Sequence, residues 1–131
     1  MAQNYIDISD FTNVTFNKTS EQVRQHYIDV ANEEIEDLAN RVGITDISLI
    51  IIPIHYKIKQ YAINFTYSLF SQDLIGANSV DIGEVDVYKD MFERSQYLIN
   101  QLITDISIEM FTGDVKERSD RSISFGKLYR S

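Results

Sequence analysis

The sequence predicts an all-α protein, an elongated bundle of three main helices with an extended N-terminal lead and a C-terminal arm. Two observations predict this fold. Apolar residues recur at steps of three and four along segments 19–43, 53–73 and 84–112, which is the period of a helix. The five glycines lie outside these segments or at their ends, where chains turn. With 131 residues, 44% of them hydrophobic, the chain is expected to form one compact domain with its own core.

The first helix is expected from Thr19 to Gly43. Thr19 and Gln22 have the spacing of a capping box, which would satisfy free amides of the first turn, and Gly43 suits a left-handed stop. One stripe of this helix is apolar: Val23, Tyr27, Val30, Ala31, Ile35, Leu38 and Val42. The opposite side is predicted to be an acidic channel or surface face: Glu33, Glu34, Glu36 and Asp37.

The second helix is expected to begin near Pro53, because a proline fits the first turn of a helix. The run Ile47–Ile52 before it suits either a strand or an apolar lead-in. Within 53–73 the helix is apolar over most of its circumference, so several neighbours must cover it. In so small a chain some of those neighbours could belong to another subunit. The residues predicted for a subunit interface are Tyr56, Ile63, Tyr67 and Phe70.

A break is expected from Gly76 to Gly83, where two glycines and an Asn-Ser pair interrupt the helical period. The third and longest helix is expected from Glu84 to Thr112, with Gly113 ending it. The N-terminal lead alternates apolar and polar residues and suits a strand or a short helix packed on the bundle. At 1.5 Å per residue the three helices would run to roughly 30 to 40 Å.

No motif in the sequence predicts chemistry. There is no cysteine, and the two histidines, His26 and His55, stand about thirty residues apart outside any HExxH arrangement. Phosphate-binding loops and nucleophile elbows are also missing from the sequence. We therefore predict no catalytic residue, no metal and no cofactor, and a protein that is not an enzyme. No apolar stretch reaches the roughly 18 residues of a membrane span, so a soluble protein is expected.

Charge divides the chain into two parts. Residues 1–114 carry seven Lys and Arg against eighteen acids, whereas residues 115–131 carry five against two. We predict a helical domain over 1–114 and a basic docking arm over 115–131. The net charge of −8 argues against a general nucleic-acid binder, which would need cations to neutralise phosphates. The residues predicted to dock on a partner are Lys116, Arg118, Arg121, Ile123, Phe125, Lys127, Leu128, Tyr129 and Arg130.

A protein partner suits this arm better than DNA does. Ile123, Phe125, Leu128 and Tyr129 need an apolar surface, which phosphates cannot give, while the cations could pair with acids on the partner. Direct contact of the cations with DNA is the alternative.

The order of these signals resembles the head-to-tail connector family of tailed bacteriophages, also called adaptor or head-completion proteins. The matching segments, about three-quarters of the chain, are the lead YIDISDF, the first helix VRQHYIDVANEEIEDLANRVGI, the proline-started PIHYKIKQYAINFTYSLF, and YKDMFERSQYLINQLITDI before a small C-terminal segment. The run ISLIII ahead of Pro53 is more apolar and β-like than the family's pattern.

The resemblance implies a structural protein of the virion neck, assembled in the host cytoplasm. Its protomers would form a ring, commonly a dodecamer, beneath the portal protein, and would offer a platform to the next neck or tail-completion protein. Genomic DNA would pass through the ring without specific binding. Two other hypotheses remain open at this point: a small acidic helical regulator or inhibitor that mimics nucleic acid, and an enzyme that uses the carboxylates of the first helix.

Overall fold

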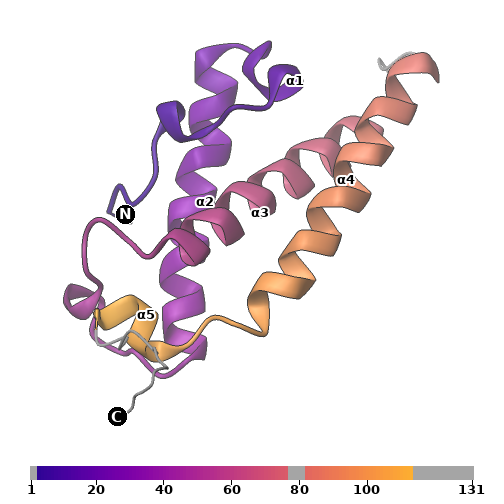
Figure 1. Ribbon diagram of the computed structural model, residues 1–131. Coiled ribbons are helices and arrows are strands. Elements are labelled where there is room, and N and C mark those ends of the chain that lie inside the picture. The colour runs from indigo at the N-terminus through magenta and orange to yellow at the C-terminus, as the bar shows by residue number, and fades with distance from the viewer. Residues whose placement is uncertain (1–2, 77–81, 114–131) are drawn as a thin grey trace.

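The computed structural model describes residues 3–76 and 82–113 and confirms the all-α fold (Figure 1). Three main helices pack together: α2 (Glu21–Arg41), α3 (Tyr56–Ile75) and α4 (Ile82–Ile103). Four short helices complete the order: η1 (Ile8–Asp10), α1 (Val14–Asn17), η2 (Ile47–Leu49) and α5 (Ile108–Thr112). The described residues contain no strand, and none of their helices is long and apolar enough to cross a membrane.

Helix α2 begins one residue later than the predicted capping box requires. Ser20 is the cap, and its hydroxyl accepts a hydrogen bond from the Val23 amide at 3.3 Å. Thr19 is not the cap, because its hydroxyl donates to the Phe16 carbonyl at 2.7 Å and so belongs to the end of α1. The predicted stop is confirmed, since Gly43 has φ of 110°, which L residues rarely adopt.

Helix α3 begins at Tyr56, three residues after the predicted start at Pro53. His55 supplies the cap that the proline cannot, since its Nδ1 accepts from the Lys57 amide at 3.1 Å. The peptide bond between Ile52 and Pro53 is cis. The apolar run before it forms no strand: η2 is a single turn capped by Asp46, and a loop follows.

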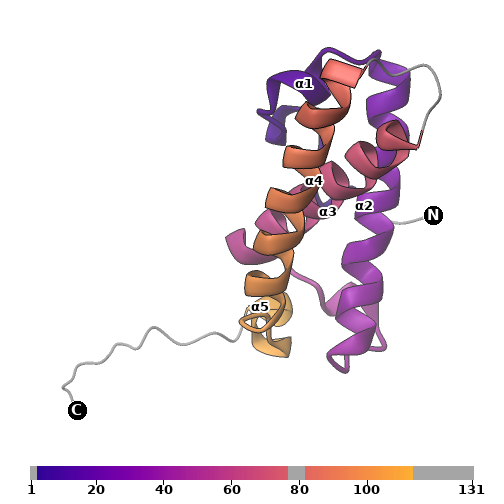
Figure 2. The same ribbon diagram turned by 90° about the vertical axis from the view of Figure 1, so that its right-hand side faces the viewer.

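The central position of α3 explains why it is apolar on most sides. It packs against α2 on one side and α4 on the other (Figures 1 and 2). Four polar residues of α3 are also buried, and three of them donate a hydrogen bond to a carbonyl of the preceding turn: Asn64 to Gln60, Thr66 to Ala62 and Ser71 to Tyr67. Ser68 instead accepts from Gln96 of α4 at 2.5 Å. Elements of the same chain therefore cover most of the helix, some of whose neighbours could have belonged to another subunit.

The predicted third helix is two helices. α4 ends at Ile103, and α5 starts at Ile108 after a short connection that turns the chain back under the bundle (Figure 1). The turn accompanies the burial of Phe111, whose side chain is fully buried. The predicted stop at Gly113 is confirmed by φ of 84°. Of the predicted break at 76–83, residues 77–81 lie outside the described chain, and 82–83 already belong to α4.

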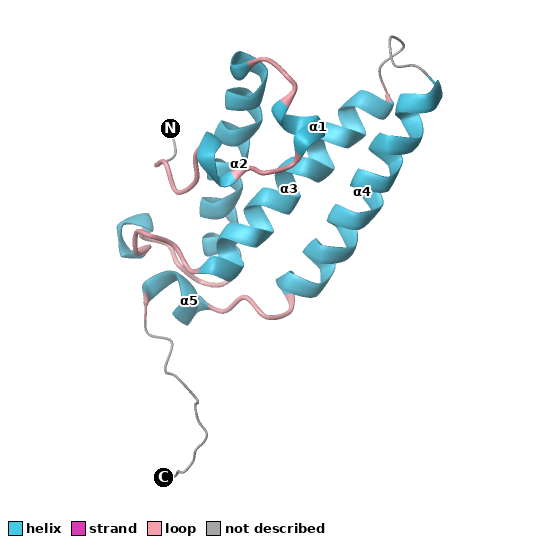
Figure 3. Cartoon of the chain, turned by 45° about the horizontal axis from the view of Figure 1, so that its top comes forward, coloured by secondary structure: helices cyan, strands magenta, loops and turns pink. Residues whose placement is uncertain are grey.

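The N-terminal lead forms two short helices that lie across α2 and α3 (Figure 3). Asn32 of α2, 2% exposed, clamps the lead, because its Oδ1 accepts from the amides of Tyr5 at 2.8 Å and Ile6 at 3.1 Å. The hydroxyl of Tyr67 on α3 accepts from the Asn13 amide at 3.1 Å. The lead is thus part of the core and closes the third side of α3.

Candidate interaction surfaces

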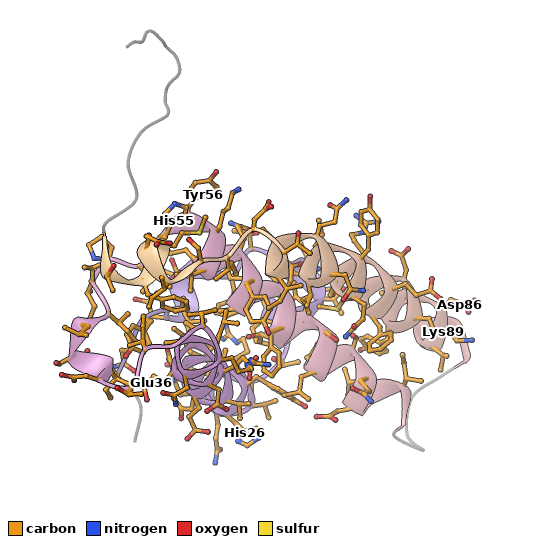
Figure 4. All side chains as sticks on the ribbon, turned by 90° about the horizontal axis from the view of Figure 1, so that it is seen from below. His26, Glu36, His55, Tyr56, Asp86 and Lys89 are labelled. Carbon is orange, nitrogen blue, oxygen red and sulfur yellow. The ribbon has the colours of Figure 1, made fainter. Side chains whose placement is uncertain are left out.

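The two histidines lie on opposite sides of the molecule (Figure 4). His26 is exposed next to the Tyr27 ring, whereas His55 caps α3 and stacks on Tyr56 at 4.8 Å between ring centroids. Burial, together with the neighbouring Lys57 ammonium, lowers the pKa of His55. Within residues 3–76 and 82–113, no three His, Cys, Asp or Glu side chains come together in a group that could hold a metal ion.

The predicted acidic face of α2 divides into two pairs. Glu33 and Asp37 are exposed to solvent. Glu34 accepts from the Tyr61 hydroxyl at 2.8 Å and pairs with Arg41, and Glu36 accepts from the Tyr5 hydroxyl at 2.8 Å. Glu34 and Glu36 therefore hold α3 and the N-terminal lead onto α2, whereas Glu33 and Asp37 remain exposed to solvent.

The four residues predicted for a subunit interface lie in different surroundings. Phe70 is 1% exposed and packs edge-on against Phe16 at 5.1 Å between centroids. Ile63 is buried in the core, and Tyr67 is half-buried beside the lead. Tyr56, 65% exposed, is the one of the four whose side chain lies open to solvent. The faces of Ile63, Tyr67 and Phe70 are thus mainly covered by their own chain.

Other apolar side chains are exposed on α5 and on the segment that leads into α3, a surface that the sequence did not predict. Its members are Leu49, Ile51, Ile52, Tyr56 and Ile108. The Ile51 amide donates to the Phe111 carbonyl at 2.8 Å, which fixes the loop before α3 against α5. Lys57 pairs with Asp105 at 3.3 Å and ties the start of α3 to the same end of the molecule. We call these five residues the α5-end surface; Tyr56 is labelled in Figure 4.

A second surface follows one side of α4. Residues 87, 90, 94, 97 and 101 recur at steps of three and four and are all exposed: Val87, Asp90, Arg94, Tyr97 and Gln101. Val87 is 51% and Tyr97 62% exposed. Local pairs order the polar members, since Arg94 binds Asp90 at 3.3 Å and Gln101 donates to the Tyr97 hydroxyl at 2.9 Å. We call this the α4 outer stripe.

A shallow groove of about 240 Å³ lies beside the α4 outer stripe. Asn13 and Thr15 line it from the N-terminal lead, Asn64 and Tyr67 from α3, and Met91 among others from α4. The lining is a mixture of amide, hydroxyl and apolar groups, which suits contact with another polypeptide. In the first turns of α4, Asp86 and Lys89 project at the end of the molecule away from Tyr56 (Figure 4).

The predicted docking arm lies outside the described residues, so nothing in the structure bears on Lys116, Arg118, Arg121 or the apolar residues after them. Comparisons with known protein families, with curated proteins and with solved structures find no match to this chain. The resemblance to phage neck proteins therefore depends on the order of the sequence signals alone.

Proposed function

We propose that the chain is a structural virion protein that forms a ring at the neck of a tailed bacteriophage, joins the portal to the tail and extends the DNA channel. The proposal assigns it no catalysis and no cofactor. The resemblance in the order of its segments supports the location, and the shape of the protomer supports the ring.

The α4 outer stripe is the observation that carries the ring. A closed ring needs two different lateral faces on each protomer, because each subunit contacts its neighbours head to tail. The outer face of α4, on the side of α3 away from α2, offers one of these lateral faces (Figure 1). The α4 side exposes Val87 and Tyr97 next to the groove, and aromatic residues are enriched where proteins meet. The exposed side of α2 carries carboxylates instead, and the proposal does not use it as a lateral face.

The acidic body suits a channel for DNA. Residues 1–114 carry seven cations against eighteen acids, so a wall built from them would make few phosphate contacts and would let DNA slide. Asp29, Glu33 and Asp37 follow one another at intervals of four residues on the exposed side of α2. In the proposed ring this row faces the channel or the outer surface.

The arm at 115–131 supplies docking in this proposal. Its cations would pair with acids of the portal protein or of the next neck protein, and its apolar residues would fill a groove there. The dodecameric stoichiometry comes from the resemblance.

Native mass spectrometry and negative-stain microscopy of the full chain test the proposal, with the protein alone at high concentration and with the portal of the same phage. A closed symmetric ring in either sample supports it. A chain that stays monomeric in both samples, or that forms only a two-fold dimer, would rule it out.

The exposed row on α2 favours a second candidate, an acidic regulator that mimics nucleic acid. Asp29, Glu33 and Asp37 present a line of negative charge that a basic DNA- or RNA-binding protein could accept in place of phosphates. This candidate predicts a tight complex whose affinity falls steeply as salt rises. Replacing the three acids by their amides should abolish that complex, whereas the proposed ring should still form.

A further inference from the structure

The α5-end surface consists of exposed apolar side chains from residues 49–56 and from α5. Leu49, Ile52 and Tyr56 are each more than half exposed, at 55%, 59% and 65%. Ile51 and Ile108 are 41% and 38% exposed, and the Ile51 amide donates to the Phe111 carbonyl of α5. Monomeric proteins seldom expose apolar side chains so close together unless something covers them.

The described chain ends at this same surface. Gly113 lies against Ile51, since a Cβ added to the glycine would lie 3.2 Å from the Ile51 Cδ1 atom. The sequence continues for residues 114–131. At roughly 3.3 Å per extended residue, ten residues span at most about 33 Å, so Ile123 can return to the surface from which the chain departs.

The chemistry of that segment matches the surface. Ile123, Phe125, Leu128 and Tyr129 provide apolar side chains, and five cations against two acids give residues 115–131 a positive charge. Exposed acids adjoin members of the α5-end surface along the chain: Asp46 caps η2, Glu109 follows Ile108 in α5, and Asp105, which binds Lys57, lies just before α5. A basic segment with apolar members therefore complements an apolar surface whose members adjoin acids along the chain.

We propose that residues 122–129 occupy the α5-end surface of their own chain. A second copy of the surface fits less well, because a two-fold pairing would bring like-charged acids together. The direct connection at Gly113 also gives the segment an effective concentration on the order of millimolar, without any second molecule. The proposal concerns a single chain and does not depend on the ring; an arm held in this way must leave the surface before it docks on a partner.

Because the sequence contains no cysteine, a nitroxide can be attached at one place through Ser124→Cys in the full chain. Ser124 alternates with Ile123 and Phe125, so a label there should leave the apolar contacts intact. We expect NMR amide signals of Leu49, Ile52 and Tyr56 to lose most of their intensity, while that of Val14, at the other end of the molecule, keeps it. Absence of this loss would overturn the proposal.

Two further samples separate the alternatives. In a mixture of unlabelled ¹⁵N chain with nitroxide-labelled ¹⁴N chain, we expect no loss of intensity; an equal loss there means that the segment is exchanged between copies and overturns its assignment to the same chain. Ile52→Asp should restore the intensities of Leu49 and Tyr56 several-fold. Val14→Asp, at a site 68% exposed on α1, is the matched control and should restore nothing. If the nitroxide reduces the intensities of Leu49 and Tyr56 as strongly in Ile52→Asp as before, residues 122–129 do not occupy the α5-end surface.

Discussion

At the scale of single residues, Asn32 holds the N-terminal lead in place. Its side chain is 2% exposed and makes three hydrogen bonds to the lead: it accepts from the amides of Tyr5 and Ile6 and donates to the Ile6 carbonyl at 3.3 Å. Without it, two backbone amides would be buried with no acceptor. The position of the lead therefore depends on Asn32. The helical pattern of the sequence did not single this residue out, because it stands next to Ala31 of the apolar stripe.

Asn32→Ala should destabilise the protein by about 2–4 kcal/mol, because each buried amide left without a partner costs roughly 1–3 kcal/mol. Urea denaturation followed by circular dichroism measures the loss. Asn40→Ala, at an exposed position of the same helix, is the control and should change stability by less than about 0.5 kcal/mol. If both variants lose the same free energy of unfolding, the hydrogen bonds of Asn32 do not hold the lead in place.

Three tyrosines join α2 to its neighbours through carboxylates. The pairs are Tyr5 with Glu36 at 2.8 Å, Tyr27 with Asp73 at 2.7 Å and Tyr61 with Glu34 at 2.8 Å. Burial, and then the hydrogen bond to Glu34, raises the pKa of Tyr61 from 10.0 to about 12. The pKa values of Tyr5 and Tyr27 are raised for the same reasons.

These shifts give the protein a pH dependence in the alkaline range. Tyr61 holds its proton more tightly in the folded protein than in the unfolded chain. Its contribution to the free energy of unfolding is therefore complete below pH 10 and is lost as the pH rises from 10 to about 12. Stability should therefore fall across this window, and Tyr61→Phe should make the fall less steep, because Phe has no proton to lose. Urea denaturation of both proteins at pH 9, 10 and 11 tests this. A pH dependence that is the same in both would refute the assignment to Tyr61.

At the scale of elements, two glycines end helices in opposite conformations. Gly43 follows α2 with φ of 110°, whereas Gly76 follows α3 with φ of −78° and has no atom closer than 3.7 Å to the position of an added Cβ. Only Gly43 needs the left-handed region that a Cβ disfavours. Glycine is therefore required by the backbone conformation at Gly43 but not at Gly76.

Gly43→Ala should cost about 1–2 kcal/mol, because the Cβ is strained in the left-handed conformation. Gly76→Ala should instead stabilise by about 0.4–1 kcal/mol, because alanine lowers the entropy of the unfolded chain without strain in the folded one. Thermal unfolding of both variants measures the difference. A loss of stability in Gly76→Ala would show that a Cβ at this position is strained or crowded despite its distance of 3.7 Å to the nearest atoms.

The sequence predicted the elements well where a local signal acts alone. The stripe of Tyr27, Ala31 and Ile35 and the stops at Gly43 and Gly113 are confirmed. The prediction was wrong at Pro53, because a proline can precede a helix without opening it and His55 provides the cap. The break between α4 and α5 was missed, because burial of Phe111 under the bundle is a tertiary effect.

The surfaces were harder to predict than the helices. A run of apolar residues such as Ile47–Ile52 ordinarily indicates burial, yet Leu49 and Ile52 are more than half exposed. Conversely, Phe70 was expected at an interface and lies in an aromatic core with Phe16 and Tyr27. Periodicity shows which residues share a face of a helix, but which element covers that face depends on the arrangement of the whole chain.

At the scale of the whole molecule, the placement of α3 between α2 and α4 decides which surfaces remain for partners. The apolar faces of α3 are mostly covered by elements of the same chain, so they no longer argue for a second subunit. The proposed ring must instead use the outer faces. On α4 these are Val87 and Tyr97, which are exposed without a covering element in the described chain.

Tyr97→Asp should therefore weaken self-assembly while leaving the monomer as stable as before. Tyr97 is 62% exposed, and surface substitutions of this kind change stability by about 0.5 kcal/mol or less, whereas burial of an unpaired aspartate in an interface is unfavourable. Native mass spectrometry gives the distribution of oligomers, and urea denaturation checks the fold. Val23→Asp, 43% exposed on α2, is the matched control and should assemble normally if the contact surface is the α4 outer stripe. If Val23→Asp blocks assembly and Tyr97→Asp does not, the subunits meet through α2 and the α4 outer stripe faces solvent.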